Sequence, residues 1–190
     1  CRSVETVVNL TNDYGAPESI VAAVENDPYT KDGADFSVTE LIKPPQIRRL
    51  RLKHEEDVYV DVRDEIWKLL GKGVHAALEQ AGDVGIKEQR LHAEHEGATI
   101  SGAIDLVNDG VVTDYKVTSV YSVQRGLKED WEKQLNLYAW LLRKNDIVAE
   151  SLRIVTICRD WMKSRSYKHD YPQSPVVVFK VPFWSDERQY

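Results

Sequence analysis

The stretch over residues 100–117, ISGAIDLVNDGVVTDYKV, constrains the fold more than any other part of the chain. Two short apolar runs flank Asp109-Gly110, and Asp-Gly between alternating hydrophobic residues is a strong signal for a β-hairpin with a type I′ turn. Counting outward from a two-residue turn pairs Asp105 with Asp114 across the two strands. A three-residue turn beginning at the preceding Asn would shift this register and loosen the pairing.

The predicted hairpin places three charged side chains together. Side chains alternate along a strand, so Asp114 and Lys116 share a face, and Asp105 joins them as the partner of Asp114. Opposed Cβ atoms lie roughly 5 Å apart, and two carboxylates at that distance repel each other. A divalent cation between them would remove the repulsion, and the lysine would project into the same site. Alternatively, these residues form the solvated side of an ordinary hairpin.

Length and composition indicate a globular protein. A chain of 190 residues suits a single domain over 1–190, with residues 1–36 peripheral and a core over about 37–183. No apolar run approaches the roughly 18 residues that a membrane span needs, and no signal peptide is visible. The two cysteines, Cys1 and Cys158, are too few for an iron–sulfur cluster, which usually takes about four, and they favour a reducing, cytoplasmic compartment.

The charge pattern leaves nucleic-acid binding open. The net charge of −6 does not by itself predict a nucleic-acid partner, but a nucleic-acid-binding protein can be acidic overall if its basic residues are clustered. One basic run falls within nine residues that contain no acid, and it is either a solvated surface or a phosphate contact: Arg48, Arg49, Arg51 and Lys53. A second cluster follows in the last third of the chain: Arg159, Lys163, Arg165, Lys168 and His169.

The first third of the chain predicts short elements. We expect an edge strand over 4–10, a helix over 18–25, and a helix that starts at Ser37 and ends before Pro44. Glu40 completes a capping box with Ser37.

A long helix is predicted over 61–82, from apolar residues at 3.6-residue spacing. Gly71 and Gly73 inside it suggest the close approach of another backbone, because each costs about 1 kcal/mol relative to Ala. His75 borders the apolar stripe, with Glu79 one turn later. A lone histidine beside an apolar face is more often a packed residue than a metal ligand.

The remaining elements complete an α/β pattern. A strand over 85–96 carries Glu88, which is either solvent-facing or part of a site, and a polar connection over 118–126 follows the hairpin. A helix over 127–144 and strands over 151–158 and 176–183 come next, and a further helix is expected to start at 186. We therefore predict a mixed central β-sheet flanked by helices.

Several motifs resemble one family when taken in order. G-A-I-D followed by D-Y-K is similar to the core motif of the PD-(D/E)XK nuclease superfamily, with Ile104 in place of the proline. The segments S-V-T-E-L-I-x-P-P, G-K-G-V-H-A-A-L-E and Q-L-N-L-Y resemble motifs of the RecB-like, phage-type exonuclease branch. Together the matches cover roughly residues 37–142.

The resemblance implies a fold like that of restriction endonucleases and a Mg²⁺- or Mn²⁺-dependent DNA exonuclease of recombination, repair or phage DNA processing. Asp105 and Asp114 would hold the cation, with His75 and the backbone carbonyl of Val117 completing the ligands, and Lys116 would act on the attacking water. The resemblance also implies accessory or DNA-binding positions: Glu79 and Glu88 as accessory acids, and Gln134 and Tyr138 beside the nucleic acid.

Other functions stay open at this stage. The alternative from a different class is a catalytically inactive DNA-binding or protein-interaction module on the same fold. DNA is the expected partner, a recombination protein or a second copy of the chain is a further possible partner, and no membrane association is expected.

Overall fold

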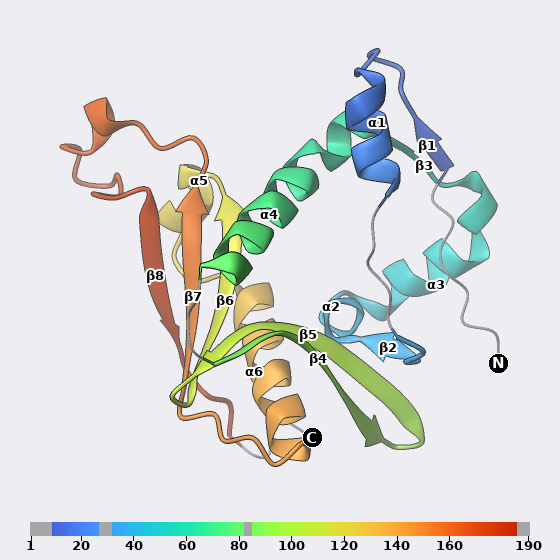
Figure 1. The fold of residues 1–190 in the computed structure, drawn as a ribbon, viewed down its shortest axis with the longest axis vertical. Helices are drawn as coiled ribbons and strands as arrows, with labels where there is room; N and C mark the ends of the chain where they lie inside the picture. Colours follow the sequence, from blue (N-terminus) through green and yellow to red (C-terminus); the bar gives the residue numbers. More distant parts are fainter. Residues whose placement is uncertain (1–8, 27–31, 82–84, 186–190) are drawn as a thin grey trace.

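The structure is a computed structural model that describes residues 9–26, 32–81 and 85–185 (Figure 1). The N-terminal elements are β1 (Asn9–Thr11), α1 (Glu18–Glu25), β2 (Phe36–Ser37), α2 (Val38–Leu41), α3 (Pro45–Lys53), the 3-10 turn η1 (Glu55–Asp57) and β3 (Tyr59–Asp61). The rest of the chain forms α4 (Val62–Gln80), β4 (Ile86–His95), β5 (Ala98–Asn108), β6 (Val111–Thr118), α5 (Val120–Gln124), α6 (Glu129–Lys144), β7 (Ser151–Cys158), η2 (Lys163–Arg165) and β8 (Val176–Val181).

The main sheet has six strands and is mixed, which confirms the predicted fold class. Its order is β2-β5-β6-β7-β8, with β4 paired to β5. The β6–β7 and β2–β5 pairs are parallel, whereas β4–β5, β5–β6 and β7–β8 are antiparallel. A second, two-stranded sheet joins β1 to β3. In Figure 1, α4 runs diagonally from the N-terminal elements toward β6.

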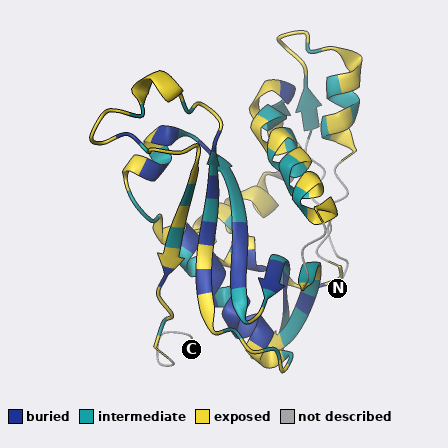
Figure 2. Cartoon of the chain, turned by 60° about the vertical axis from the view of Figure 1, so that its left-hand side comes forward, coloured by how far each residue is buried: buried dark blue, intermediate teal, exposed yellow. Residues whose placement is uncertain are grey.

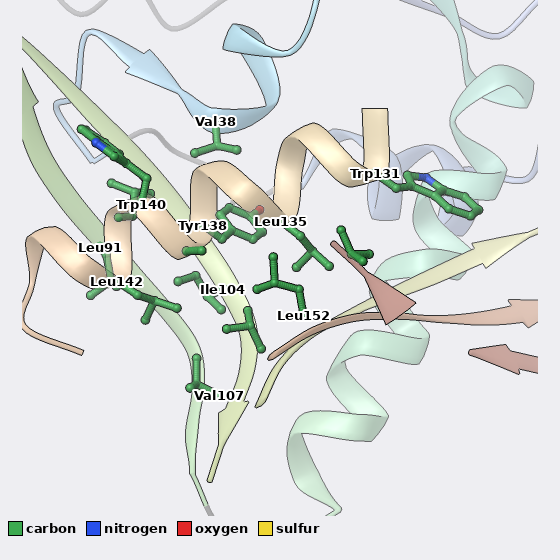
Figure 3. Close-up of a cluster of buried hydrophobic side chains, with 14 of the residues drawn as sticks. Val38, Leu91, Ile104, Val107, Trp131, Leu135, Tyr138, Trp140, Leu142 and Leu152 are labelled. Atoms are coloured by element: carbon green, nitrogen blue, oxygen red, sulfur yellow. The ribbon is translucent and has the colours of Figure 1, made fainter. Parts of the chain in front are cut away.

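Helix α6 supplies the central layer of the core. Its first turn is acidic and its last turn basic, which suits the helix dipole at both ends. The helix expected over 127–144 is confirmed, and five of its side chains at helical spacing are buried: Trp131, Leu135, Tyr138, Ala139 and Leu142. Figure 3 shows these side chains meeting residues of β4, β5 and β7, including Leu91, Ile104 and Leu152. This packing holds the strands that carry the site residues.

The hairpin turn forms as predicted, but the pairing is shorter. Asp109 and Gly110 have φ values of 46° and 73°, as a type I′ turn requires. The register is also the predicted one, and it ends at Leu106–Thr113. The expected Asp105–Asp114 strand pair is therefore wrong. Beyond Thr113 the strands separate, and the Tyr115 N–H donates to Asp105 Oδ2 at 2.7 Å, replacing a backbone ladder bond.

Several helix and strand boundaries also differ from expectation. The predicted polar connection after the hairpin contains α5, which Ser119 caps, because Val120 and Val123 pack into a second small core with Cys158 and Tyr171. The capping box of Ser37 and Glu40 is confirmed. The proposed helix start at 186 and most of the strand expected over 4–10 lie outside the described residues.

Helix α4 is more exposed than its pattern predicts. Only Val62 is fully buried among its residues, and Leu70 is 41% exposed (Figure 2). The expected close approach at Gly71 and Gly73 is wrong, because a Cβ at either position would meet nothing within 4 Å. No helix in the described ranges is long and apolar enough to cross a membrane.

The tightest glycine in the core is Gly102 on β5. An added Cβ would lie 2.8 Å from both Tyr138 Cε1 and Leu141 Cδ1. We expect Gly102→Ala to lower the free energy of unfolding by about 1–3 kcal/mol through overpacking. The matched change Gly73→Ala, in an open helix position, should raise it by about 0.5–1 kcal/mol. Urea unfolding of both variants measures this, and a neutral Gly102→Ala would contradict the packing described.

Candidate active site

The site forms where β5 and β6 part. One edge of β5 pairs with β2 at Ile100–Ser101 and with β6 from Leu106 onward. Asp105 lies between these two pairings, at the point where a backbone N–H of β6 turns to its carboxylate. Helix α4 packs along β6 and brings His75 to the same place.

His75 is oriented by the backbone of β6. Its Nε2 lies 3.1 Å from the carbonyl oxygen of Tyr115. A carbonyl can only accept, so Nε2 carries the proton and donates it. The other nitrogen, Nδ1, faces Glu88 Oε1 at 3.4 Å and Asp105 Oδ2 at 3.6 Å. Metal-binding histidines commonly donate their second ring N–H to a carbonyl in this way. Nδ1 is thus left either to bind a proton or to bind a cation.

Two carboxylates oppose each other beside that nitrogen. The β4–β5 ladder pairs Lys87 with Leu106 and Gln89 with Ile104, which sets Glu88 opposite Asp105. The backbone of Glu88 has a φ of 44°, a left-handed conformation that is uncommon outside glycine, and the regular pairing is interrupted there. Such local strain is often found at functional sites. The opposed carboxylates predicted for the hairpin therefore occur across β4 and β5.

These three residues fit a small divalent cation. One ligand atom from each of His75, Glu88 and Asp105 lies within 4.8 Å of the other two. One imidazole nitrogen and two carboxylates suit Mg²⁺ or Mn²⁺ by donor type. A pocket of about 10 Å³ lies against them, and it is lined by His75, Leu78, Glu79, Lys87, Glu88, Asp105, Leu106 and Tyr115.

Asp114 and Lys116 form an ion pair at the edge of this cluster. Lys116 Nζ lies 2.9 Å from Oδ1 and 2.8 Å from Oδ2 of Asp114, whose side chain is only 2% exposed. The two side chains therefore lie on the same face of β6, as predicted, and they contact each other directly. In this arrangement the Asp114 carboxylate is bound by Lys116 and stands outside the group formed by His75, Glu88 and Asp105.

The electrostatics of the cluster favour added positive charge. Burial, followed by repulsion from Asp114, raises the pKa of Asp105 to about 7, although His75, Lys116 and the Tyr115 N–H act in the opposite direction. The pKa of His75 is raised, chiefly by its hydrogen bond to Glu88, and burial offsets part of that rise. Neighbouring carboxylates contribute to both shifts, because Asp114 raises the pKa of Asp105 and Glu88, Asp105 and Asp114 raise that of His75.

The backbone carbonyl that contacts His75 belongs to Tyr115, and the role of the Val117 carbonyl as a metal ligand stays a prediction. Val117 lies two residues further along the same edge of β6. Glu79 is exposed at the end of α4 and lines the pocket, and its backbone carbonyl accepts a hydrogen bond from Lys87 Nζ at 3.0 Å. Lys87 and the Tyr115 backbone were not predicted from the sequence. Strand alternation would place Lys87 on the opposite face from Glu88, and nothing in the sequence marks a carbonyl.

Gln134 and Tyr138 lie in the core. Gln134 Nε2 donates to the Tyr138 hydroxyl at 2.8 Å, and the two side chains are 6% and 4% exposed. Tyr138 also packs against Gly102 of β5. Their contact with nucleic acid stays a prediction, and here they support the strand that carries Asp105.

The first basic run forms the exposed helix α3, which begins with Pro45 at its first turn. Arg48 covers the ring of Phe36 at 4.4 Å from its centroid. In Figure 1, α3 lies on the opposite side of α4 from β6, β7 and β8, so the structure does not gather this run into the cluster around His75.

Comparisons with known proteins agree with this fold. The solved structure of SSO0001 aligns with a TM-score of 0.60 at 19% identity, covering 89% of this chain and 78% of that chain, a likeness of fold alone. A protein from Eubacterium rectale named "Putative exonuclease" aligns with a TM-score of 0.39 at 12% identity, over 93% of this chain and 63% of that chain, which is too low to support an argument. A search of curated proteins finds no match.

A family model covers most of the sequence. The model of the PD-(D/E)XK nuclease superfamily matches residues 9–159, a range that includes α4, the hairpin and α6. The chain belongs to the PD-(D/E)XK nuclease superfamily.

Proposed function

We propose that this protein is a Mg²⁺- or Mn²⁺-dependent deoxyribonuclease that hydrolyses phosphodiester bonds, most simply as an exonuclease of the RecB-like branch. One observation carries the proposal: His75, Glu88 and Asp105 converge within 4.8 Å, next to the Asp114–Lys116 ion pair. A nitrogen ligand beside two carboxylates favours Mn²⁺ over Mg²⁺, since imidazole suits transition metals better.

Each residue has a role that its contacts support. His75 Nδ1, Glu88 and Asp105 would hold the cation, and the Tyr115 carbonyl fixes the imidazole so that Nδ1 faces it. When bound, such a cation lowers the pKa of a water ligand and polarises a phosphate oxygen. Asp105 is itself held by the Tyr115 N–H, so its carboxylate does not depend on the ion for its position.

Lys116 would act on the phosphate and on the attacking water. Its ammonium is held by the buried Asp114 carboxylate. This ion pair restricts the motion of the lysine and keeps its positive charge beside the cluster. From there it can donate hydrogen bonds to the negative charge that develops on the phosphate oxygens, and it can orient the water. Asp114 then either remains the anchor of Lys116 or turns to the cation as a fourth protein ligand.

The rest of the proposal follows from the family resemblance and the charge pattern. The basic residues of α3 would bind phosphates outside the site. Gln134 and Tyr138 would position the DNA strand at the active centre. The proposed substrate is DNA, and the proposed role lies in recombination, repair or phage DNA processing. The proposed location is the cytoplasm. A recombination protein or a second copy of the chain would be the protein partner.

Cation binding should compete with protons at the site. Asp105 has a pKa of about 7 and His75 has a raised pKa, so both are largely protonated at pH 6 and must release protons when Mn²⁺ binds. We expect the Mn²⁺ affinity to fall about tenfold or more for each pH unit below 7 and to level off above pH 8. Isothermal titration calorimetry at several pH values measures this dependence.

A matched pair of acid variants checks that this competition occurs at the proposed site. Asp105→Asn should abolish Mn²⁺ binding, whereas Glu79→Gln, on the exposed rim, should leave it nearly unchanged. Affinity that does not vary between pH 6 and 8, or equal loss in both variants, would contradict the assignment.

Replacing Lys116 separates chemistry from binding. Lys116→Met keeps the bulk of the stem and removes the charge, so cleavage of end-labelled DNA should fall on the order of 10²-fold or more. Mn²⁺ binding should survive. A circular DNA control tests the exonuclease assignment, because only linear DNA should be degraded.

Wild-type cleavage by Lys116→Met would remove the main support for this mechanism. Absence of cleavage by the wild-type protein in both Mg²⁺ and Mn²⁺ would instead favour an inactive binding module.

A further inference from the structure

Trp67 is an exposed aromatic residue on the helix that carries His75. Its side chain is 55% exposed, although tryptophan is largely buried on average in folded proteins. The guanidinium of Arg159 lies over its ring, with Cζ 4.3 Å from the centroid. The ring is thus held by a cation–π contact with Arg159, and more than half of the side chain is still exposed to solvent.

The position of Arg159 ties this ring to the catalytic strand. Arg159 directly follows β7, and its backbone N–H donates to the carbonyl of Thr118, the last residue of β6, at 2.9 Å. Lys116 lies two residues before Thr118 on that strand. The Trp67–Arg159 pair therefore connects α4 to the carboxyl ends of β6 and β7. Lys116 lies near the same end of β6.

The spacing along α4 suits a bound strand. Trp67 precedes His75 by eight residues, which in an α-helix corresponds to about 12 Å. Successive phosphates of one strand advance by about 3.4 Å along the axis in B-form DNA, and a single strand can extend further for each nucleotide. A strand with its scissile phosphate at His75 would therefore place a base at Trp67 within about four nucleotides.

The loop that begins at Arg159 supplies a basic rim. Its basic residues are all exposed: Arg159, Lys163, Arg165, Lys168 and His169. Of its two acids, Asp160 accepts the N–H of Val120 at 2.7 Å and is thereby held against α5, and Asp170 Oδ1 lies 2.8 Å from His169 Nδ1. The positive charge of the loop therefore rests on its two arginines and two lysines.

The fold of the loop is fixed by its own contacts. Trp161 Nε1 donates to the Pro172 carbonyl at 2.8 Å, and the Met162 N–H donates to the hydroxyl of the buried Tyr171 at 2.7 Å. The loop that follows Arg159 is thus held in a defined conformation, and its exposed basic residues suit a phosphate backbone.

We propose that Trp67, held by Arg159, is a stacking platform for an unpaired base of the substrate, and that the protein binds its DNA as a single strand. This inference deepens the proposed function and rests on it. A base inside a duplex has both faces covered by its neighbours, so only a single strand or an unwound end can offer a free face to the indole. The basic rim would bind the flanking phosphates.

Binding measured without metal tests the platform separately from catalysis. Fluorescence anisotropy with labelled oligothymidylates in EDTA should show that Trp67→Ala weakens binding about 5- to 150-fold, the usual range for one base-stacking side chain. Trp67→Phe should retain most of the affinity, since a smaller ring still stacks. Tyr59→Ala is the matched control, because Tyr59 is 66% exposed on β3 but is not part of this surface, and it should bind as wild type.

Abasic strands identify stacking as the cause. A strand of abasic residues keeps the phosphates and removes the bases, so wild type should bind it more weakly than oligothymidylate, and Trp67→Ala should bind the two nearly equally. Wild-type affinity in Trp67→Ala, or an equal loss for oligothymidylate and for blunt duplex DNA, would overturn the inference. If instead no DNA is cleaved in Mn²⁺ while Trp67→Ala still loses oligothymidylate binding, the proposed nuclease activity fails and the platform stands.

Discussion

The hydrogen bond from the Tyr115 N–H to the Asp105 carboxylate is the contact on which the site depends. It lies just beyond Leu106–Thr113, the last backbone pair of the hairpin. There the Asp105 side chain accepts a hydrogen bond that a backbone carbonyl of β5 would otherwise accept, and the two strands separate. The same peptide segment presents the Tyr115 carbonyl to His75. One residue of β6 therefore fixes Asp105 of β5 through its N–H and His75 of α4 through its carbonyl.

The carboxylates gathered around this contact repel one another, so the site depends on the packing that holds its strands together. Glu88 and Asp105 face each other, Asp114 is almost completely buried, and the protein supplies His75 and Lys116 as counter-charges. The core around α6 holds the strands in place against this repulsion, and an added divalent cation relieves it. Burial, and after it repulsion from Asp114, raises the pKa of Asp105, and the left-handed backbone of Glu88 lies at the same place.

Much of this architecture is predictable from the sequence, and the rest depends on tertiary geometry. Asp-Gly chemistry determines the hairpin turn and its register, and 3.6-residue periodicity identifies α6, because both are local effects. The point at which β6 stops pairing with β5 and continues beside β7 depends on contacts distant in the sequence. This point decides that Asp105 faces Glu88 on β4 and is not paired with Asp114 across the hairpin. The exposure of Trp67 depends on the tertiary fold as well, since helical periodicity does not say which aromatic side chains of α4 a neighbouring element covers.

The central claim is that a single divalent cation is held directly by His75 Nδ1 together with the Glu88 and Asp105 carboxylates. Pulsed electron paramagnetic resonance of the protein loaded with one equivalent of Mn²⁺ tests it most directly, because a coordinated imidazole gives a resolved nitrogen coupling. We expect that coupling in the wild-type protein, a change when the histidines carry ¹⁵N, and its loss in His75→Gln. A bound Mn²⁺ with no nitrogen coupling, or a coupling that persists unchanged in His75→Gln, would contradict the account.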